Sequence, residues 1–418
     1  MSKNTIVSGK IRHHAALADP LTEVLRTGAR ELLGQAIRVE LEALLEETSS
    51  LVTESGHRRI VRNGYLPERT VQTGIGPVDV KVPRVRDRAP TAEGTITFTP
   101  TMLPRYLRKS RSLEALIPWL YLKGISTGQF GEALTALLGP GAPGLSSTTI
   151  SRLKAGWQQD LESWQKRDLR GKRYLYWWAD GVYFNVRMEE ASQCVLVIIG
   201  VTEDGTKELV AVTDGYREST ASWREIFLDL KQRGLELAPK VATGDGALGF
   251  WSALAEQYPT TTVQRCWVHK IANVLNALPK SMHGKAKAHL RDIYRAETAK
   301  EADKAFAYFL AAYQPKYPKA AETLRKDREA LLAFYAFPAE HWVSLRTTNP
   351  IESTFSTVRL RTNTSRGCFS RATVLTMVFQ LMRSAQNNWR RLNAPEHLTS
   401  VAKNILFIDG IHPAKIAA

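Results

Sequence analysis

The alternation of strand-like and helical segments between residues 171 and 278 constrains the fold of this chain more than any other feature. It opens with the aromatic run "RYLYWW", and two β-branched runs follow on either side of "EDGT", a hairpin signal. Two further short apolar runs then alternate with helical segments, so the expected order is β-β-β-α-β-α-β-α. This order predicts an α/β fold, a mixed sheet with helices on its faces. The segment carries no glycine fingerprint of a dinucleotide-binding fold.

Helical patterns dominate on both sides of this segment. Asp19-Pro20 is typical of a helix start, and apolar residues recur at helical spacing over residues 21–45. Thr27-Gly28 interrupts that pattern and is consistent with two helices in place of one. Residues 278–339 are rich in Ala, Lys and Tyr and are expected to be helical apart from one proline-containing break. Residues 372–389 are expected to form a last helix.

Two segments before the strand-rich region, "GQFGEALTALLG" and "PGAPGLSSTTISRLKAGW", have the pattern of two short helices around a turn. The second carries small polar residues and an arginine near its start: Ser147, Thr148, Thr149 and Arg152. One interpretation is a helix-turn-helix whose second helix presents these residues to a DNA groove. The other is a plain helical hairpin in a bundle, and the sequence favours neither.

The overall charge indicates the class of partner. The 418 residues carry a formal net charge of +16, which favours a polyanionic partner and most simply nucleic acid. No apolar run approaches membrane-spanning length, and the longest conspicuous one, residues 195–201, suits a buried strand. The three widely spaced cysteines predict a reducing compartment and no disulfide framework.

Two aspartates stand apart from the other acidic residues. Asp180 and Asp245 each come directly after an apolar or aromatic strand, in "LYWWAD" and "KVATGD". In an open sheet, side chains at strand ends face the crevice where ligands bind. Each aspartate also precedes a glycine, and Asp-Gly is a common turn pair. Taken singly, each is therefore explained equally well by a turn or by a site.

Glu352 also has two interpretations. Asn349-Pro350-Ile351-Glu352 is typical of a helix start, with Asn as the N-cap, Pro at the first position and Glu as half of a capping box. Alternatively, Glu352 joins Asp180 and Asp245 in a cluster of three carboxylates. Carboxylate oxygens suit Mg²⁺, and two such ions can activate a nucleophile and stabilise the leaving oxygen of a phosphodiester.

Four segments, taken in order, resemble motifs of the bacterial Mutator-type insertion-sequence transposases. They are "ADGVYFNVR", "TGDGALGFW", "VQRCWVHKIANVL" and "FPAEHWVSLRTTNPIESTFSTVRLRT". The likeness covers about residues 20–395 and implies a ribonuclease-H-like catalytic domain with a DDE triad. Carried over residue by residue, it implies Asp180, Asp245 and Glu352 as catalytic metal ligands, with Cys266 and His269 beside the active site.

The resemblance also implies the organisation of the chain. We expect a mainly helical N-terminal DNA-binding portion, made of a helical and short-strand region at 1–104 and a helix-turn-helix-like DNA-binding and dimerisation region at 105–169. The first part of the catalytic domain follows at 170–278, then an all-helical insertion at 279–340. The second part of the catalytic domain, with the glutamate helix, occupies 341–395, and a tail occupies 396–418.

The remaining candidate residues surround the glutamate motif. We expect Arg346, Arg359 and Arg361 to contact DNA phosphates, with solvated surface charge as the alternative for Arg359. Trp342 is either a core residue, the default for a tryptophan, or a platform on which a DNA base stacks. Cys266 and His269 are not expected to form a structural zinc site, because no second pair of residues stands at ligand spacing.

The predicted function is that of a DNA transposase that cleaves and transfers strands with two Mg²⁺ ions, for which Mn²⁺ is a possible substitute. The expected partners are double-stranded DNA, both the terminal inverted repeats and the target, and further copies of the chain in a homodimer or higher multimer. The expected location is the bacterial cytoplasm, in association with the nucleoid. Two alternatives are a nuclease of the same fold without strand transfer, and a DNA-binding repressor with an inactive site.

Overall fold

The computed structural model describes residues 20–91, 94–110, 147–184, 193–215, 217–246, 248–364 and 370–416, together with 113, 116 and 120. The chain forms two compact units, Met1–Ile150 and Ser151–Ala418. Among the described residues, no helix is both long and apolar enough to cross a membrane.

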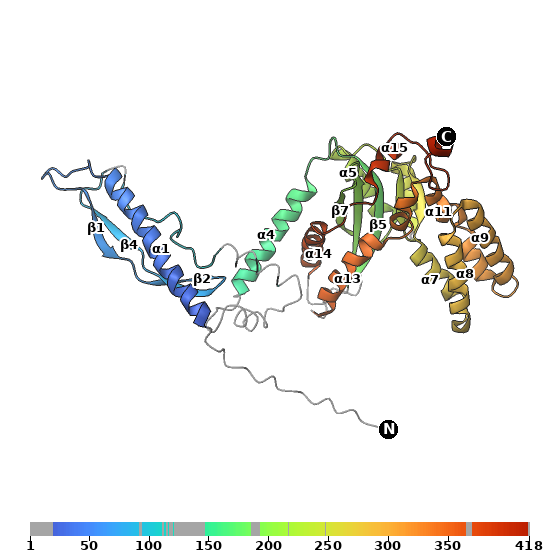
Figure 1. Cartoon of the computed structure of the whole chain (residues 1–418), viewed down its shortest axis with the longest axis horizontal. Helices are drawn as coiled ribbons and strands as arrows, with labels where there is room; N and C mark the ends of the chain where they lie inside the picture. Colours follow the sequence, from blue (N-terminus) through green and yellow to red (C-terminus); the bar gives the residue numbers. More distant parts are fainter. Residues whose placement is uncertain are drawn as a thin grey trace, which may run out of the picture. The chain divides into compact units, whose positions relative to one another are not determined.

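The first unit packs one long helix against two antiparallel ribbons (Figure 1). Helix α1 (Pro20–Glu47) starts at the expected proline but runs unbroken through Thr27-Gly28, so the division into two helices is wrong. Strand β1 (Ile60–Tyr65) pairs with β4 (Pro83–Asp87), and β2 (Arg69–Thr73) pairs with β3 (Gly76–Val80).

The apolar face of α1 covers one face of these strands. Ile37 packs with the valines of β2 and β3, and Leu41 packs with Ile60 of β1 and Val85 of β4. The described residues between 20 and 104 therefore hold one helix and four short strands. Alternating valines produce this result, because each strand buries one face against α1. Most of residues 105–146 lie outside the described residues, so the expectation of a mainly helical portion at 1–169 stays a prediction.

The first helix of the expected helix-turn-helix lies outside the described residues. Its second helix is α4 (Ser147–Gln165), which buries Trp157, Leu161 and Trp164. The ring centroids of Trp164 and Phe379 lie 5.0 Å apart, so the far end of α4 packs on the second unit's own helix α14 (Arg371–Gln386).

The second unit is built on a mixed sheet that has, in its described residues, the strand order β7-β6-β5-β8-β9. The strands are β5 (Tyr174–Phe184), β6 (Gln193–Thr202), β7 (Lys207–Gly215), β8 (Val241–Gly244) and β9 (Thr262–Arg265). The first three pair antiparallel, and β5, β8 and β9 pair parallel. The α/β class, the expected order of elements and the hairpin at residues 203–206 are confirmed.

Side chains of β5 alternate between two helical layers, and this positions the site. Trp177 faces the aromatic core made with α5 (Thr220–Gln232) and α6 (Leu248–Gln257). Tyr176 and Trp178 face the other way, where Trp178 donates from Nε1 to the Ser344 carbonyl at 2.9 Å. Because strand side chains alternate, Asp180 shares the face of Tyr176 and Trp178.

A helical segment follows β9 and precedes helices α12 to α14. It comprises α7 (Trp267–Asn276), α8 (His283–Arg295), α9 (Ala299–Tyr313), α10 (Pro318–Arg325) and α11 (Arg328–Leu332). The expected proline break falls between α9 and α10. Helices α12 (Trp342–Leu345), α13 (Asn349–Thr364) and α14 follow, and α15 (Leu398–Ala402) and α16 (Pro413–Ile416) come after α14, which is therefore not the last helix.

Candidate active site

Asp180 lies on β5, and Asp245 directly follows the neighbouring parallel strand β8. Trp178 of β5 pairs with Thr243 of β8, and Asp180 and Asp245 each come two residues later, Asp245 just beyond the end of β8. Adjacent strands lie about 4.8 Å apart, which places the two carboxylates in one neighbourhood. Asp245 directly follows its strand, as expected. Asp180 does not, because β5 continues to Phe184 and Asp180 pairs with Val197 of β6 within the strand.

Glu352 lies in the first turn of α13, but Asn349 is not its cap. Thr348 occupies the cap position, where its carbonyl accepts from the backbone N–H groups of Ile351 and Glu352 at 2.9 and 3.0 Å. The Thr348 hydroxyl donates to Oε1 of Glu352 at 3.1 Å. The Asn349 N–H instead donates to the Thr347 hydroxyl. The predicted capping box between Asn349 and Glu352 is therefore wrong, and Thr348 holds the Glu352 carboxylate.

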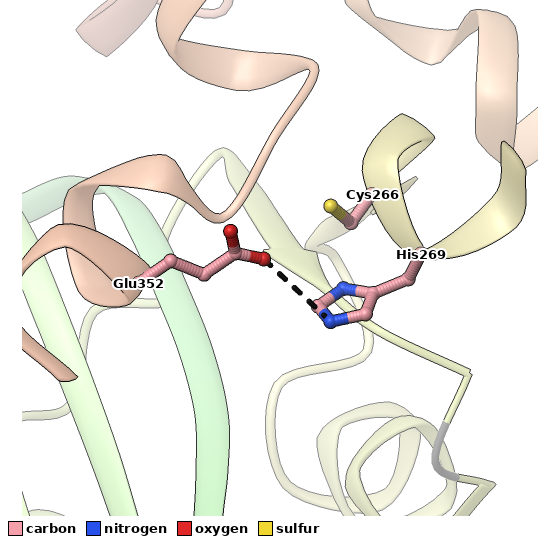
Figure 2. A group of neighbouring side chains, drawn as sticks. All are labelled: Cys266, His269 and Glu352. Atoms are coloured by element: carbon pink, nitrogen blue, oxygen red, sulfur yellow. Dashed lines mark ion pairs between the residues drawn. The ribbon is translucent and has the colours of Figure 1, made fainter. Parts of the chain in front are cut away.

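Cys266 and His269 at the start of α7 meet Glu352 (Figure 2). Nε2 of His269 lies 3.6 Å from Oε1 of Glu352, and the ligand-type atoms of Cys266, His269 and Glu352 all lie within 4.8 Å of one another. The buried Cys266 sulfur also accepts from the Thr348 N–H at 3.4 Å and lies 3.4 Å from its hydroxyl. Thr348 thus joins the starts of α7 and α13.

The charges of these groups act on one another. Burial raises the pKa of Asp180 to about 7, and the carboxylates of Asp245 and Glu352 add to the rise while His269 opposes it. The neighbouring Cys266 sulfur raises the pKa of His269 to about 9 against the effect of burial, and Asp180 and Asp245 add to this rise. The three carboxylates and the imidazole therefore share one electrostatic neighbourhood.

The donor set fits a hard divalent cation. Burial is the main cause of the raised pKa of Asp180, and the charges of Asp245 and Glu352 add to it, so a cation bound near these carboxylates would lower the cost of ionising Asp180. The group of Cys266, His269 and Glu352 offers softer donors, but Thr348 already engages the Cys266 sulfur. A structural zinc site is therefore a poorer explanation of these residues.

Sequence reasoning missed Glu218, a fourth carboxylate next to this cluster. Burial, then the charges of Asp245 and Asp180, raise its pKa to about 7. A Cβ added at Gly181 would lie 2.4 Å from Oε1 of Glu218, and one added at Gly249 would lie 2.3 Å from its carbonyl oxygen. The two glycines therefore make room for Glu218. Its sequence signal was Gly181: within a strand, a glycine marks a close approach and not a turn.

Of the residues expected at the DNA, Trp342 is buried and Arg346 is half-buried. Trp342 is 8% exposed, packs against Phe334 and Tyr335, and donates its indole N–H to the Phe337 carbonyl at 2.8 Å. Trp342 is therefore a core residue, and the expectation that a DNA base stacks on it is corrected. The Arg346 guanidinium donates to the carbonyls of Trp342 and Tyr294 and lies between two aromatic rings. Its expected DNA contact stays a prediction.

The structure describes the other residues expected to contact DNA only in part. Arg359 on α13 and Arg152 on α4 are exposed. Ser147, Thr148 and Thr149 form the first turn of α4, but their side chains, like that of Arg361, lie outside the description. Their expected DNA contacts stay predictions.

The second unit is an α/β fold in which the charges of Asp180, Asp245 and Glu352 act on one another, and the chain as a whole is basic. Comparison with known proteins shows the family. The family described as "Transposase, Mutator family" matches residues 2–392, and the chain belongs to this family.

Named relatives agree with this assignment. The transposase for insertion sequence element IST2 of Acidithiobacillus ferrooxidans is 52% identical over 292 residues, 68% of this chain and 96% of that protein. The transposase for IS6120 of Mycolicibacterium smegmatis is 49% identical over 298 residues, 71% of this chain and 92% of that protein. Among solved structures, a Drosophila P element transposase strand transfer complex covers 66% of this chain and 82% of that chain at 14% identity, with a TM-score of only 0.25.

Proposed function

We propose that the chain is an active DNA transposase whose second unit is a ribonuclease-H-like catalytic domain with Asp180, Asp245 and Glu352 as its DDE triad. The observation that carries the proposal is the electrostatic effect of Asp245 and Glu352 on Asp180, supported by the parallel pairing of β5 with β8 next to the two aspartates. A Mutator-family transposase needs such a site to break and join phosphodiester bonds.

The three carboxylates would hold two Mg²⁺ ions, with Mn²⁺ as a possible substitute. Bound in this way, the ions would activate the attacking oxygen and stabilise the leaving oxygen at the scissile phosphate. The Thr348 hydroxyl fixes the Glu352 carboxylate, and His269 lies beside it, where it can contact the phosphate or steady Glu352. Water is the first nucleophile and frees a 3′-OH at the element end, and this 3′-OH then attacks target DNA.

The first unit and α4 would bind the terminal inverted repeats, and two element ends require at least two copies of the chain. The test is incubation with duplex DNA that carries the inverted repeat bracketing the reading frame, in Mg²⁺. We expect cleavage at the repeat end and joining of that end to a target plasmid. Cleavage without joining would indicate the nuclease alternative. Binding with neither reaction would indicate a repressor.

The affinity for divalent cations should rise with pH. The pKa of Asp180, about 7 against an ordinary 3.8, means that the folded protein keeps a proton that the unfolded chain has already lost. As pH rises from about 4 to about 7, this group therefore lowers the stability of the metal-free protein, and above about 7 its carboxylate is available to a cation. Calorimetric titration with Mn²⁺ at about pH 6 and about pH 8 measures the effect. Equal affinities, or the same pH dependence in Asp180→Asn, would contradict it.

Glu218→Gln should slow cleavage by about 10-fold to 100-fold without weakening DNA binding, which is the usual effect of losing an outer carboxylate at a metal site. Gly181→Ala should produce a similar defect, because the added Cβ would displace the Glu218 carboxylate. The matched control is Glu225→Gln, an exposed carboxylate on α5. The cleavage rates of the three variants are measured on one duplex. If Glu218→Gln cleaves as fast as Glu225→Gln, Glu218 has no part in the site.

A further inference from the structure

A row of arginines lies along and just beyond β4, on the outward face of the β1–β4 ribbon. Arg84 and Arg86 lie on the strand, Arg88 directly follows its end, and all three are exposed. Val85, between them, is buried with Leu41 of α1. Because successive strand side chains point to opposite faces, the arginines lie on the face away from α1 and repeat about every 7 Å.

No acidic residue in the described part of the chain neutralises this row. The ribbon's one acid, Asp87, is fully engaged by Arg59, which donates from Nε and Nη2 to its two carboxylate oxygens at 2.8 Å each. Asp87 also accepts from the backbone N–H groups of Ala89 and Ile96 at 3.1 Å. Its side chain is wholly buried, so it orders the base of the ribbon without offsetting the exposed arginines.

The partner strand adds neutral groups to the same face. Val61 of β1 pairs with Arg86 across the ribbon, and Asn63 follows two residues later, in the stretch between Arg62 and Tyr65 where the register shifts. Arginine recognises the major-groove edge of guanine, asparagine that of adenine, and an apolar side chain contacts the thymine methyl group. A two-stranded ribbon is also narrow enough to enter the major groove.

We propose that the outward face of the β1–β4 ribbon reads the major groove of the terminal inverted repeat. This rests on the proposed function and names the element that gives it sequence specificity. This surface is made of different residues from the start of α4, the other candidate for DNA contact. Its charge matches duplex DNA, and its mixture of Arg, Asn and Val side chains matches base edges as well as phosphates.

The test is binding in EDTA, so that affinity is read without cleavage. The triple variant R84A/R86A/R88A should bind a duplex carrying the terminal repeat about 100-fold more weakly than the native chain, with a shallower dependence on salt. Arg86→Lys keeps the charge but loses the bidentate contact. It should lose about 10-fold in affinity for the repeat and little for a scrambled duplex. The matched control R390A/K403A/K415A removes three exposed charges from the other unit and should bind normally.

Two results would overturn the inference. One is a triple variant that binds the repeat as tightly as the control. The other is a triple variant that loses affinity equally for the repeat and the scrambled duplex, together with an Arg86→Lys variant that binds like the native chain. That result would mean that the ribbon contacts only phosphates. Both results can be told apart from failure of the catalytic proposal. Binding is measured even if the chain does not cleave DNA. Conversely, a chain that cleaves DNA could still bind the repeat without using the ribbon.

Discussion

Glu352→Gln is expected to lower the rate of DNA cleavage by about 1,000-fold or more, since loss of a metal-bridging carboxylate costs about 4 kcal/mol of transition-state stabilisation. Binding to the terminal repeat should be unchanged. In the native chain the Thr348 hydroxyl donates to Oε1 of Glu352 at 3.1 Å. Glutamine has a side chain of the same length, and its amide oxygen can accept this hydrogen bond. Helix α13 should therefore start as before, because Thr348 and not Glu352 occupies its cap position.

The same loss is expected of Asp180→Asn and Asp245→Asn, because the charges of these two residues act on one another. Cleavage of the repeat duplex in Mg²⁺, together with direct titration of Mn²⁺, separates loss of metal from loss of chemistry. The matched control is Glu340→Gln, an exposed glutamate that precedes α12. Near-native cleavage by Glu352→Gln would remove Glu352 from the metal site and leave it a role in the structure of α13 alone.

Asp327→Ala is expected to lower the free energy of unfolding by about 3–5 kcal/mol, the usual cost of leaving buried charge without its partner. Asp327 contacts Nζ of Lys270, which is 2% exposed, and lies 3.5 Å from Nη2 of Arg265. Lys270 also donates to the Thr323 carbonyl at 2.9 Å, so it joins α7 to α10. Because α7 carries His269, the variant should also cleave DNA more slowly.

Urea unfolding followed by tryptophan fluorescence measures the change. Asp303→Ala breaks the exposed pair with Arg328 in the same helical segment and should cost less than about 1 kcal/mol. The double variant K270M/D327L removes both charges, and it should recover most of the lost stability. If Asp327→Ala costs no more than Asp303→Ala, the buried pair does not hold α7 in place.

Local patterns in the sequence were sufficient to predict the order of elements in the second unit. Hydrophobic period and turn chemistry act over a few residues, so the hairpin at residues 203–206 and the start of α1 at Pro20 appear where expected. The same reasoning failed at Thr27-Gly28, where packing of α1 on the ribbons sustains a helix that propensity alone would interrupt.

The sequence by itself determined which residue types were available: strand-rich segments, the three acids and an excess of positive charge. Only the tertiary structure decided which of them meet. The pairing of β5 with β8 brings Asp180 and Asp245 close enough for their charges to interact, two glycines admit Glu218, and burial makes Trp342 a core residue. The physical reason is that register and burial depend on contacts between residues far apart in the chain, and no local pattern encodes them.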